Sequence, residues 1–174
     1  MPMIMIEGVD GTGKTTLANA LGKAQGWPVV KIWKNESLVY LNWFFDLGAG
    51  TYRDDLFFMD SWLNLGRPDC IIDRGILSGV VYEGEQDKCG RILEFWMNRM
   101  KEYKEEVRFV ILDAPDEVVK ERDPSAEDFQ LYRRRFQEYS KVLKDKGFYV
   151  QTFDTQELNE EALLMLVWML GGTR

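Results

Sequence analysis

The sequence predicts an α/β fold in which a five-stranded parallel sheet is flanked by helices. Two observations support this prediction. Five short apolar segments of strand length recur along the 174 residues, and stretches with the spacing of amphipathic helices separate them. This alternation is typical of a parallel sheet covered on both faces. Since domains commonly have about 100–200 residues, we expect a single domain over residues 1–174.

The first strand and helix have the clearest patterns. Residues 3–6 form a continuous apolar run, as in a buried strand, and a glycine-rich turn follows. Apolar residues then recur at helical spacing over 14–25, and Gly26 and Pro28 end this helix. Residues 29–33 predict the second strand.

The middle of the chain predicts two helical stretches before the third strand. Ser37 is a suitable N-cap for a helix that the glycines of residues 48–50 end, and a second helical stretch covers about 53–65. The apolar run 70–72 predicts the third strand, and Asp73 stands at its carboxyl end.

The C-terminal half continues the alternation. A long, highly charged helix, closed by a glycine, is its most distinct element. The expected elements are helices over 88–104, 116–121, 126–146 and 158–170, and strands over 107–112 and 148–153.

Composition excludes several classes of function. The net charge of −7 provides no basic field for a nucleic-acid polymer or an anionic membrane, so we expect neither as a partner. The chain has no histidine, which removes Ser-His-Asp triads and histidine-ligated zinc or haem. Any chemistry must come from carboxylates, lysine, arginine and the backbone.

The cysteines and the apolar runs indicate a cytoplasmic protein. Cys70 and Cys89 form no C-x-x-C pair, and we expect both thiols to be reduced. The longest apolar run, 162–170, is far shorter than the roughly 20 residues of a membrane span, and the amino terminus shows no targeting signal.

A phosphate-binding motif lies between the first strand and the first helix. Residues 8–15 read G-V-D-G-T-G-K-T and match G-x-x-x-x-G-K-[ST], the P-loop. Glycines allow the turns that aim backbone N–H groups at phosphates, Lys14 can bridge the β- and γ-phosphates, and Thr15 can ligate Mg²⁺. The motif therefore predicts that the α/β fold is the three-layer sandwich of P-loop NTPases. It also predicts ATP and Mg²⁺ as cofactors. The expected nucleotide-binding residues are Gly8, Asp10, Gly11, Thr12, Gly13, Lys14, Thr15 and Thr16.

A P-loop does not by itself define the reaction. One hypothesis is a kinase that moves the γ-phosphate to a small molecule, and the other is a switch or motor that hydrolyses the nucleotide. A GTPase switch needs an N-K-x-D guanine motif, which the sequence lacks. The kinase is therefore favoured.

The segment after the third strand resembles a known family. Residues 73–84 read D-R-G-I-L-S-G-V-V-Y-E-G and resemble the D-R-Y-x-x-S-x-x-A-Y-Q-G segment of thymidylate kinases. Residues 7–16 are similar to that family's E-G-x-[DE]-G-x-G-K-[ST]-T, and residues 112–122 resemble its L-D-x-x-P-E-x-A-x-E-R stretch. The resemblance implies ATP-dependent phosphorylation of a deoxynucleoside monophosphate, dTMP or a related one, by a single P-loop kinase domain, and it allows a homodimer.

Residues of this segment are the expected acceptor site. An arginine at the carboxyl edge of a strand suits the phosphate of a monophosphate acceptor, and Arg74 is placed there. Asp73 would help to hold the Mg²⁺ shell or position the acceptor. The resemblance implies that Asp10 contacts the 3′-hydroxyl of the sugar and that Tyr82 disfavours a 2′-hydroxyl. Ser78, which matches the same motif, is placed with these substrate-binding residues.

Two further acceptor contacts are expected upstream. In the family an arginine reads the thymine carbonyl, and Arg53 fits by ungapped counting. Lys34 follows the second strand, where the family usually has an arginine for the acceptor phosphate, although a solvated lysine is an equal alternative. The runner-up activity is a deoxynucleoside kinase, which needs a carboxylate base after the second strand, and Glu36 could supply it.

The lid that closes over the phosphoryl group is short, near residues 122–128. Relatives carry a longer arginine-rich insertion there, and Gly11 stands where one branch of the family has an arginine. Phosphoryl transfer needs positive charge, so we expect Arg122 to join Lys14, Asp10 and Arg74 as a catalytic residue. Second candidates are the three arginines of residues 133–135. The alternatives are that Arg122 pairs with Asp116 or Glu121 and that the arginine run is a solvated helix face.

Overall fold

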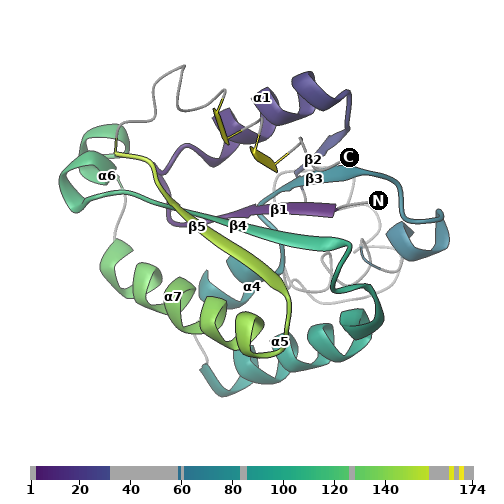
Figure 1. Ribbon diagram of the computed structural model, residues 1–174. Coiled ribbons are helices and arrows are strands. Elements are labelled where there is room, and N and C mark those ends of the chain that lie inside the picture. The colour runs from purple at the N-terminus through teal and green to yellow at the C-terminus, as the bar shows by residue number, and fades with distance from the viewer. Residues whose placement is uncertain are drawn as a thin grey trace, which may run out of the picture.

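The computed structural model has one sheet at the centre of the described chain. The described residues are 3–31, 59, 61–82, 86–125, 128–156, 165–166 and 169–170. Within them, five strands pair in the order β2-β3-β1-β4-β5, and every neighbouring pair is parallel (Figure 1). The predicted five-stranded parallel sheet is confirmed. The strands are β1 (Met3–Glu7), β2 (Val29–Val30), β3 (Cys70–Asp73), β4 (Val107–Asp113) and β5 (Tyr149–Asp154).

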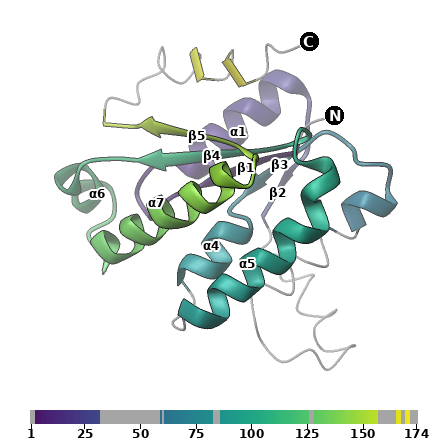
Figure 2. The same ribbon diagram turned by 60° about the horizontal axis from the view of Figure 1, so that its bottom comes forward.

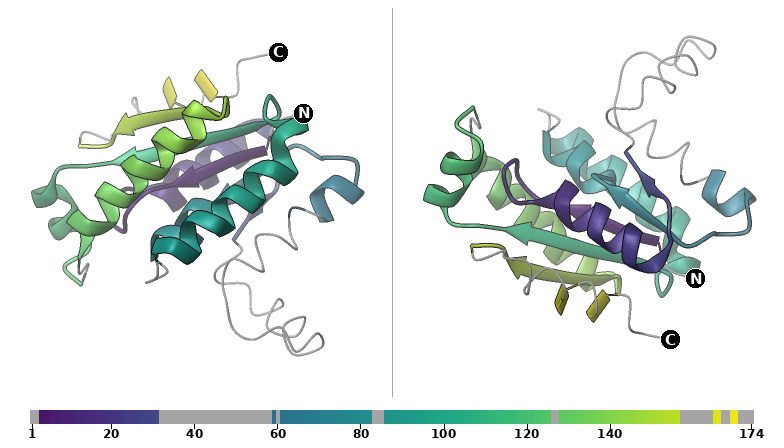
Figure 3. Two further views of the ribbon diagram at one scale, coloured as in Figure 1. Left: turned by 90° about the horizontal axis from the view of Figure 1, so that it is seen from below. Right: turned by 90° about the horizontal axis from the view of Figure 1, so that it is seen from above.

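Helices cover both faces of the sheet and make three layers. The helix α1 lies on one face together with residues 165–166 and 169–170, and α4, α5 and α7 lie on the other (Figure 2). Figure 3 shows the same layers from below and from above. The helices are α1 (Lys14–Gln25), α4 (Ile76–Tyr82), α5 (Gln86–Met100), α6 (Asp116–Arg122) and α7 (Phe129–Asp145), with a 3₁₀ turn η2 (Lys101–Tyr103) after α5.

Alternating side chains of β1 supply two separate cores. Met3 and Met5 pack with the cluster under α4, α5 and α7, whereas Ile4 and Ile6 pack with the cluster under α1. All five residues of β1 are buried, as expected for the central strand of a sheet covered on both faces.

The central place of β1 decides where the phosphate loop lies. Because β1 is paired with β3 on one side and β4 on the other, Ile6 is level with Asp73, and Glu7 is level with Ile111. The carboxyl ends of parallel strands meet at one edge of a sheet. The loop over residues 8–13 therefore emerges beside the corner that follows β3.

Several predicted element ends differ from the structure. The predicted helix over 88–104 divides into α5 and the tighter turn η2, and the helix predicted over 126–146 is α7, preceded by Asp128 in a left-handed conformation (φ 50°). The fifth strand is one residue later than predicted. Of the predicted helix over 53–65, residues 59 and 61–64 are helical, and most of the helices predicted over 37–50 and 158–170 lie outside the described residues.

Cys70, the first residue of β3, is a buried free thiol, and burial raises its pKa to about 12.

In the part of the chain that the structure describes, no helix combines the length and the apolar character needed to cross a membrane.

Candidate functional site

Glycines shape the loop between β1 and α1. Gly11 and Gly13 have φ angles of 78° and 86°, in the left-handed region that favours glycine. Gly8 has a φ of 136°, and a Cβ built there would lie 2.2 Å from the carbonyl oxygen of Leu112 in β4. The close approach of the loop to β4 therefore requires glycine at position 8.

The start of α1 faces this loop. Gly13 is the N-cap residue, and no side chain caps the helix. The first N–H groups of a helix have no partner inside it, and the helix dipole adds partial positive charge there. With no acidic residue in the first turn of α1, this end of the helix is suited to bind an anion.

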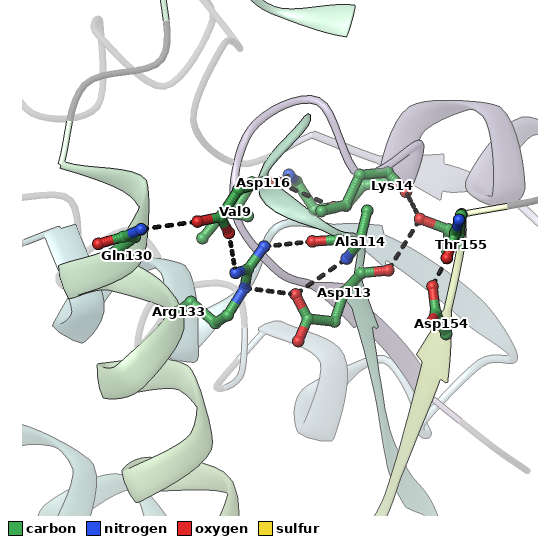
Figure 4. Close-up of polar contacts among 11 residues, drawn as sticks. Val9, Lys14, Asp113, Ala114, Asp116, Gln130, Arg133, Asp154 and Thr155 are labelled. Atoms are coloured by element: carbon green, nitrogen blue, oxygen red, sulfur yellow. Dashed lines mark hydrogen bonds and ion pairs between the residues drawn. The ribbon is translucent and has the colours of Figure 1, made fainter. Parts of the chain in front are cut away.

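Lys14 is buried within the loop. Its ammonium donates a hydrogen bond to the Val9 carbonyl at 2.5 Å (Figure 4). The same ammonium lies 3.8 Å from Oδ1 of Asp10. Thr12 also donates to the Val9 carbonyl, at 2.8 Å. Burial, with a contribution from the nearby Arg74 guanidinium, lowers the pKa of Lys14 to about 8.

Thr15 and Asp73, the two predicted metal ligands, meet at the carboxyl edge of the sheet. The Thr15 hydroxyl donates to Oδ2 of Asp73 at 2.7 Å, and Oδ1 of Asp73 is buried with no partner among the described residues. Oxygen ligands of this kind suit Mg²⁺, which takes one or two carboxylate or hydroxyl groups and completes its shell with phosphates and water. The described residues contain no cluster of three or more metal-binding side chains, so phosphate oxygens would have to complete such a shell.

Lys31 is a cation at the same place that the sequence analysis did not identify. It follows β2, and its ammonium lies 3.4 Å from Oδ2 of Asp73. The predicted Lys34 lies three residues further on. Lys34, Glu36 and Arg53 are all outside the described residues.

Asp10 and Arg74 connect the phosphate loop to the corner after β3. The Arg74 guanidinium forms an ion pair and a hydrogen bond with Oδ1 of Asp10, and the backbone of Arg74 is left-handed, with a φ of 71°. Burial opposes the charge on Arg74, but the Asp10 carboxylate outweighs it and holds the pKa of Arg74 above its ordinary value. The structure thus brings together Asp10, Lys14 and Arg74, three of the four predicted catalytic residues.

Tyr82 lies near this group, at the end of α4. Its ring packs on Tyr132 (centroids 4.6 Å apart) and on Phe136 (6.2 Å) from α7. Burial raises the pKa of Tyr82, the Asp10 charge adds to this, and Arg74 opposes it. Tyr82 is therefore close enough to Asp10 and Arg74 to share one site with them.

Glu7 is a buried carboxylate to which the sequence analysis assigned no role. Its Oε1 accepts hydrogen bonds from the backbone N–H groups of Gly75 (3.0 Å) and Leu77 (3.1 Å). Its Oε2 accepts from the N–H (3.1 Å) and the hydroxyl (2.6 Å) of Ser78. Burial raises the pKa of Glu7 to about 7, although these bonds oppose the rise. The Ser78 hydroxyl, predicted to bind substrate, is instead fully buried against Glu7.

Arg122 contacts backbone carbonyls and not the acidic residues considered above. Its guanidinium donates to the carbonyl of Thr155 at 2.9 Å and to that of Gln156 at 3.4 Å. The hydroxyl of the buried Thr155 lies 3.1 Å from the carbonyl oxygen of Thr12 and 3.0 Å from that of Asp113. The segment after β5 therefore places the exposed Arg122 beside the phosphate loop.

The three consecutive arginines of α7 have three different environments. Arg133 donates to Asp113 at 2.7 Å and also contacts Asp116 and the Ala114 carbonyl, which ties α7 to the segment after β4 (Figure 4). Arg135 donates to the Val81 carbonyl of α4 at 2.8 Å. Of the three, only Arg134 is classed as exposed.

Comparisons with known proteins show the fold. No protein-family model and no curated protein matches the chain. Among solved structures, it is similar to the YorR protein of Bacillus subtilis in complex with phosphorylated GDP, at 21% identity over 97% of this chain and 95% of that one, with a TM-score of 0.62. Deoxyadenosine kinase of M. mycoides with bound dATP has 16% identity, coverage of 98% and 100%, and a TM-score of 0.62. Thymidylate kinase of Candida albicans has 16% identity, coverage of 98% and 91%, and a TM-score of 0.63. The chain therefore has the P-loop fold of nucleoside and nucleotide kinases.

Proposed function

We propose that the chain is an ATP- and Mg²⁺-dependent kinase that phosphorylates a deoxynucleoside monophosphate, dTMP or a related one, to the diphosphate. One observation carries the proposal: the Asp10 carboxylate lies between the Lys14 ammonium of the phosphate loop and the Arg74 guanidinium of the β3 corner. Two cations, each suited to a different phosphate, are held side by side. A kinase whose acceptor is itself a phosphate needs such cations, because both of its reactants are anions.

The phosphate loop is the proposed donor site. The free N–H groups at the start of α1 and the Lys14 ammonium would bind the β- and γ-phosphates of ATP. Thr15 and Asp73 would hold Mg²⁺, which neutralises charge on the transferring phosphoryl group. The buried Oδ1 of Asp73, without a described protein partner, supports this assignment.

Arg74 is the proposed ligand for the acceptor phosphate. Its planar fork matches two phosphate oxygens, and a doubly charged phosphate competes for it with the single charge of Asp10. Asp10 is then next to the acceptor and can accept a hydrogen bond from the sugar's 3′-hydroxyl. Tyr82, supported from behind by Tyr132 and Phe136, is proposed to pack under the deoxyribose.

Arg122 is proposed as the cation that contacts the transferring phosphoryl group. Its position beside the loop, through Thr155 and Thr12, supports this role. Arg133 is a weaker candidate because two carboxylates and a carbonyl already occupy its fork. Lys34 and Arg53 stay proposals for the acceptor side.

A deoxynucleoside kinase is the second candidate, because the fold likeness includes deoxyadenosine kinase over almost the whole chain. A panel assay separates the possibilities. Purified protein with Mg-ATP is offered each common nucleoside and nucleoside monophosphate, in deoxy and ribo forms, and ADP and the phosphorylated product are both measured. Turnover of deoxynucleoside monophosphates supports the proposal. Turnover of nucleosides alone supports the second candidate, and ATP binding without transfer indicates a nucleotide-binding switch.

A further inference from the structure

Glu7 has an environment that its place in the sequence does not suggest. It is the last residue of β1, directly before the phosphate loop, and its side chain is fully buried. Both carboxylate oxygens nevertheless bond to residues 75–78, at the start of α4. Its position in the sequence therefore suggests a role toward ATP, whereas its contacts are with the acceptor side.

The corner between β3 and α4 is fixed from two sides. The backbone N–H of Arg74 donates to the Ile6 carbonyl at 3.1 Å, which sets the point where the chain leaves β3. Arg74 then turns in a left-handed conformation, and Gly75 passes directly over Glu7. A Cβ at position 75 would lie 3.2 Å from Oε1 of Glu7 and 3.0 Å from Sδ of Met5, tighter than nearly all real contacts.

Four donors on one carboxylate make a strong and directional clamp. Three backbone N–H groups and one hydroxyl are oriented toward Glu7, and each of its oxygens accepts two of them. Hydrogen bonds to a charged group are stronger than neutral ones, and they fix direction as well as distance. Moving the corner would leave donors or the carboxylate unpaired in the core, which is costly.

We propose that Glu7 is the positioning residue of the acceptor half of the site: it clamps residues 75–78, so that Arg74, the residue directly before them, faces Asp10. The clamp is a statement about geometry, and its effect on acceptor binding rests on the proposed function. Glu7 touches neither reactant; it acts through Arg74, which directly precedes the clamped residues.

The proposal predicts different effects on the KM of the acceptor and on the Kd of Mg-ATP. In Glu7→Gln one oxygen becomes an NH₂ group that opposes backbone N–H donors. We expect the KM of the acceptor to rise about tenfold or more, the size of losing hydrogen bonds to a charged group. The Kd of Mg-ATP, measured by calorimetry without acceptor, should change by less than about threefold, a smaller factor than the expected rise in the acceptor KM. Ser78→Ala, which removes one donor of the four, should move the acceptor KM in the same direction by a smaller factor.

The experiment compares the two variants with Ser140→Ala as a matched control. Like Ser78, Ser140 has a buried hydroxyl, but it lies in α7 and this hydroxyl has no hydrogen-bond partner among the described residues. Amide hydrogen exchange is followed at residues 75–78 and at 8–15. Faster exchange at 75–78 in Glu7→Gln, with a higher acceptor KM and an unchanged Kd for Mg-ATP, supports the proposal. Weakened Mg-ATP binding with an unchanged acceptor KM, or faster exchange at 8–15 alone, overturns it.

The readouts also separate this proposal from the proposed function. If the wild-type protein phosphorylates no deoxynucleoside monophosphate, the proposed function fails, and hydrogen exchange alone decides whether Glu7 clamps the corner. If Glu7→Gln does not fold, Ser78→Ala carries the test. In that variant, unchanged exchange at 75–78 overturns the clamp, and faster exchange there with unchanged exchange in Ser140→Ala supports it.

Discussion

The Asp10 carboxylate and the Arg74 guanidinium pair across 64 residues of sequence, and this contact joins the two halves of the candidate site. Asp10 also lies 3.8 Å from the Lys14 ammonium. One carboxylate thus lies close to two cations and partly neutralises the charge of both. Phosphate groups of the reactants would compete with Asp10 for these cations.

Arg74→Ala should impair the acceptor more than the donor. We expect the KM of the acceptor monophosphate to rise and kcat to fall, because the lost fork is the proposed ligand of the acceptor phosphate, while the Kd of Mg-ATP stays near that of the wild type. Steady-state kinetics with varied acceptor, together with calorimetry of Mg-ATP alone, measure the two effects. An increase in the Kd of Mg-ATP as large as the increase in the acceptor KM would contradict the assignment of Arg74.

Lys14→Ala should lower turnover by about 10²-fold or more, the usual scale for losing a preorganised charge at a transferring phosphoryl group. The fold should persist, as judged by circular dichroism. A second consequence follows from its pKa of about 8. Mg-ATP binding to the free protein should weaken as pH rises through 8, because the ammonium loses its proton. Lys14→Arg, which stays charged, should bind Mg-ATP without that pH dependence.

Arg122→Ala should lower kcat and kcat/KM about equally, by on the order of 10²-fold, with little change in the Kd of Mg-ATP. Such a pattern is typical of a contact made only in the transition state. Arg91→Ala, an exposed arginine on α5, is the control and should behave like the wild type. A larger effect in Arg134→Ala than in Arg122→Ala would instead assign the role to α7.

Glu7 should make stability depend on pH in a direction unusual for a carboxylate. Its pKa is about 7 in the fold against an ordinary 4.5, so the folded state holds the proton more tightly than the unfolded chain does. The resulting stabilisation is complete below about pH 4.5 and is lost as pH rises to 7. Relative to Glu7→Gln, the wild type should therefore lose unfolding free energy between pH 4.5 and 7. Urea titrations of both proteins at several pH values measure this, and a difference that is flat or rises with pH would argue against the raised pKa.

Tyr82 should discriminate between sugars. If the ring packs under the deoxyribose and excludes a 2′-hydroxyl, Tyr82→Ala should narrow the ratio of kcat/KM for dTMP over its ribose analogue. The neighbouring Tyr132→Phe, which keeps its ring, is the control. A wild-type protein that already accepts both sugars equally would refute the deoxyribose assignment.

Local patterns were sufficient to predict most of the fold and part of the site. The five strands and the phosphate loop follow from short apolar runs and from glycine, lysine and threonine at fixed spacing, which are properties of neighbouring residues. The meeting of Thr15 with Asp73 follows as well, because parallel strands end at the same edge of a sheet.

Contacts that depend on tertiary packing could not be predicted. Glu7 bonds to residues about 70 positions away, and nothing in an apolar strand indicates what a terminal carboxylate will face. Three consecutive arginines point in directions about 100° apart around a helix, so only the packing of α7 decides that Arg133 reaches Asp113 while Arg134 is exposed. Lys31 was not predicted because its partner, Asp73, lies on the neighbouring strand.

The central claim is that the acceptor is a phosphate, and phosphorus NMR of the reaction products tests it directly. The protein is incubated with Mg-ATP and either dTMP or thymidine in separate reactions, and the thymine-containing products are separated from ADP before their signals are assigned. We predict a diphosphate pair of signals from dTDP in the dTMP reaction, formed together with ADP and reduced in Arg74→Ala. Formation of dTMP in the thymidine reaction without formation of dTDP in the dTMP reaction, or release of free phosphate and ADP as the only products, would contradict the claim.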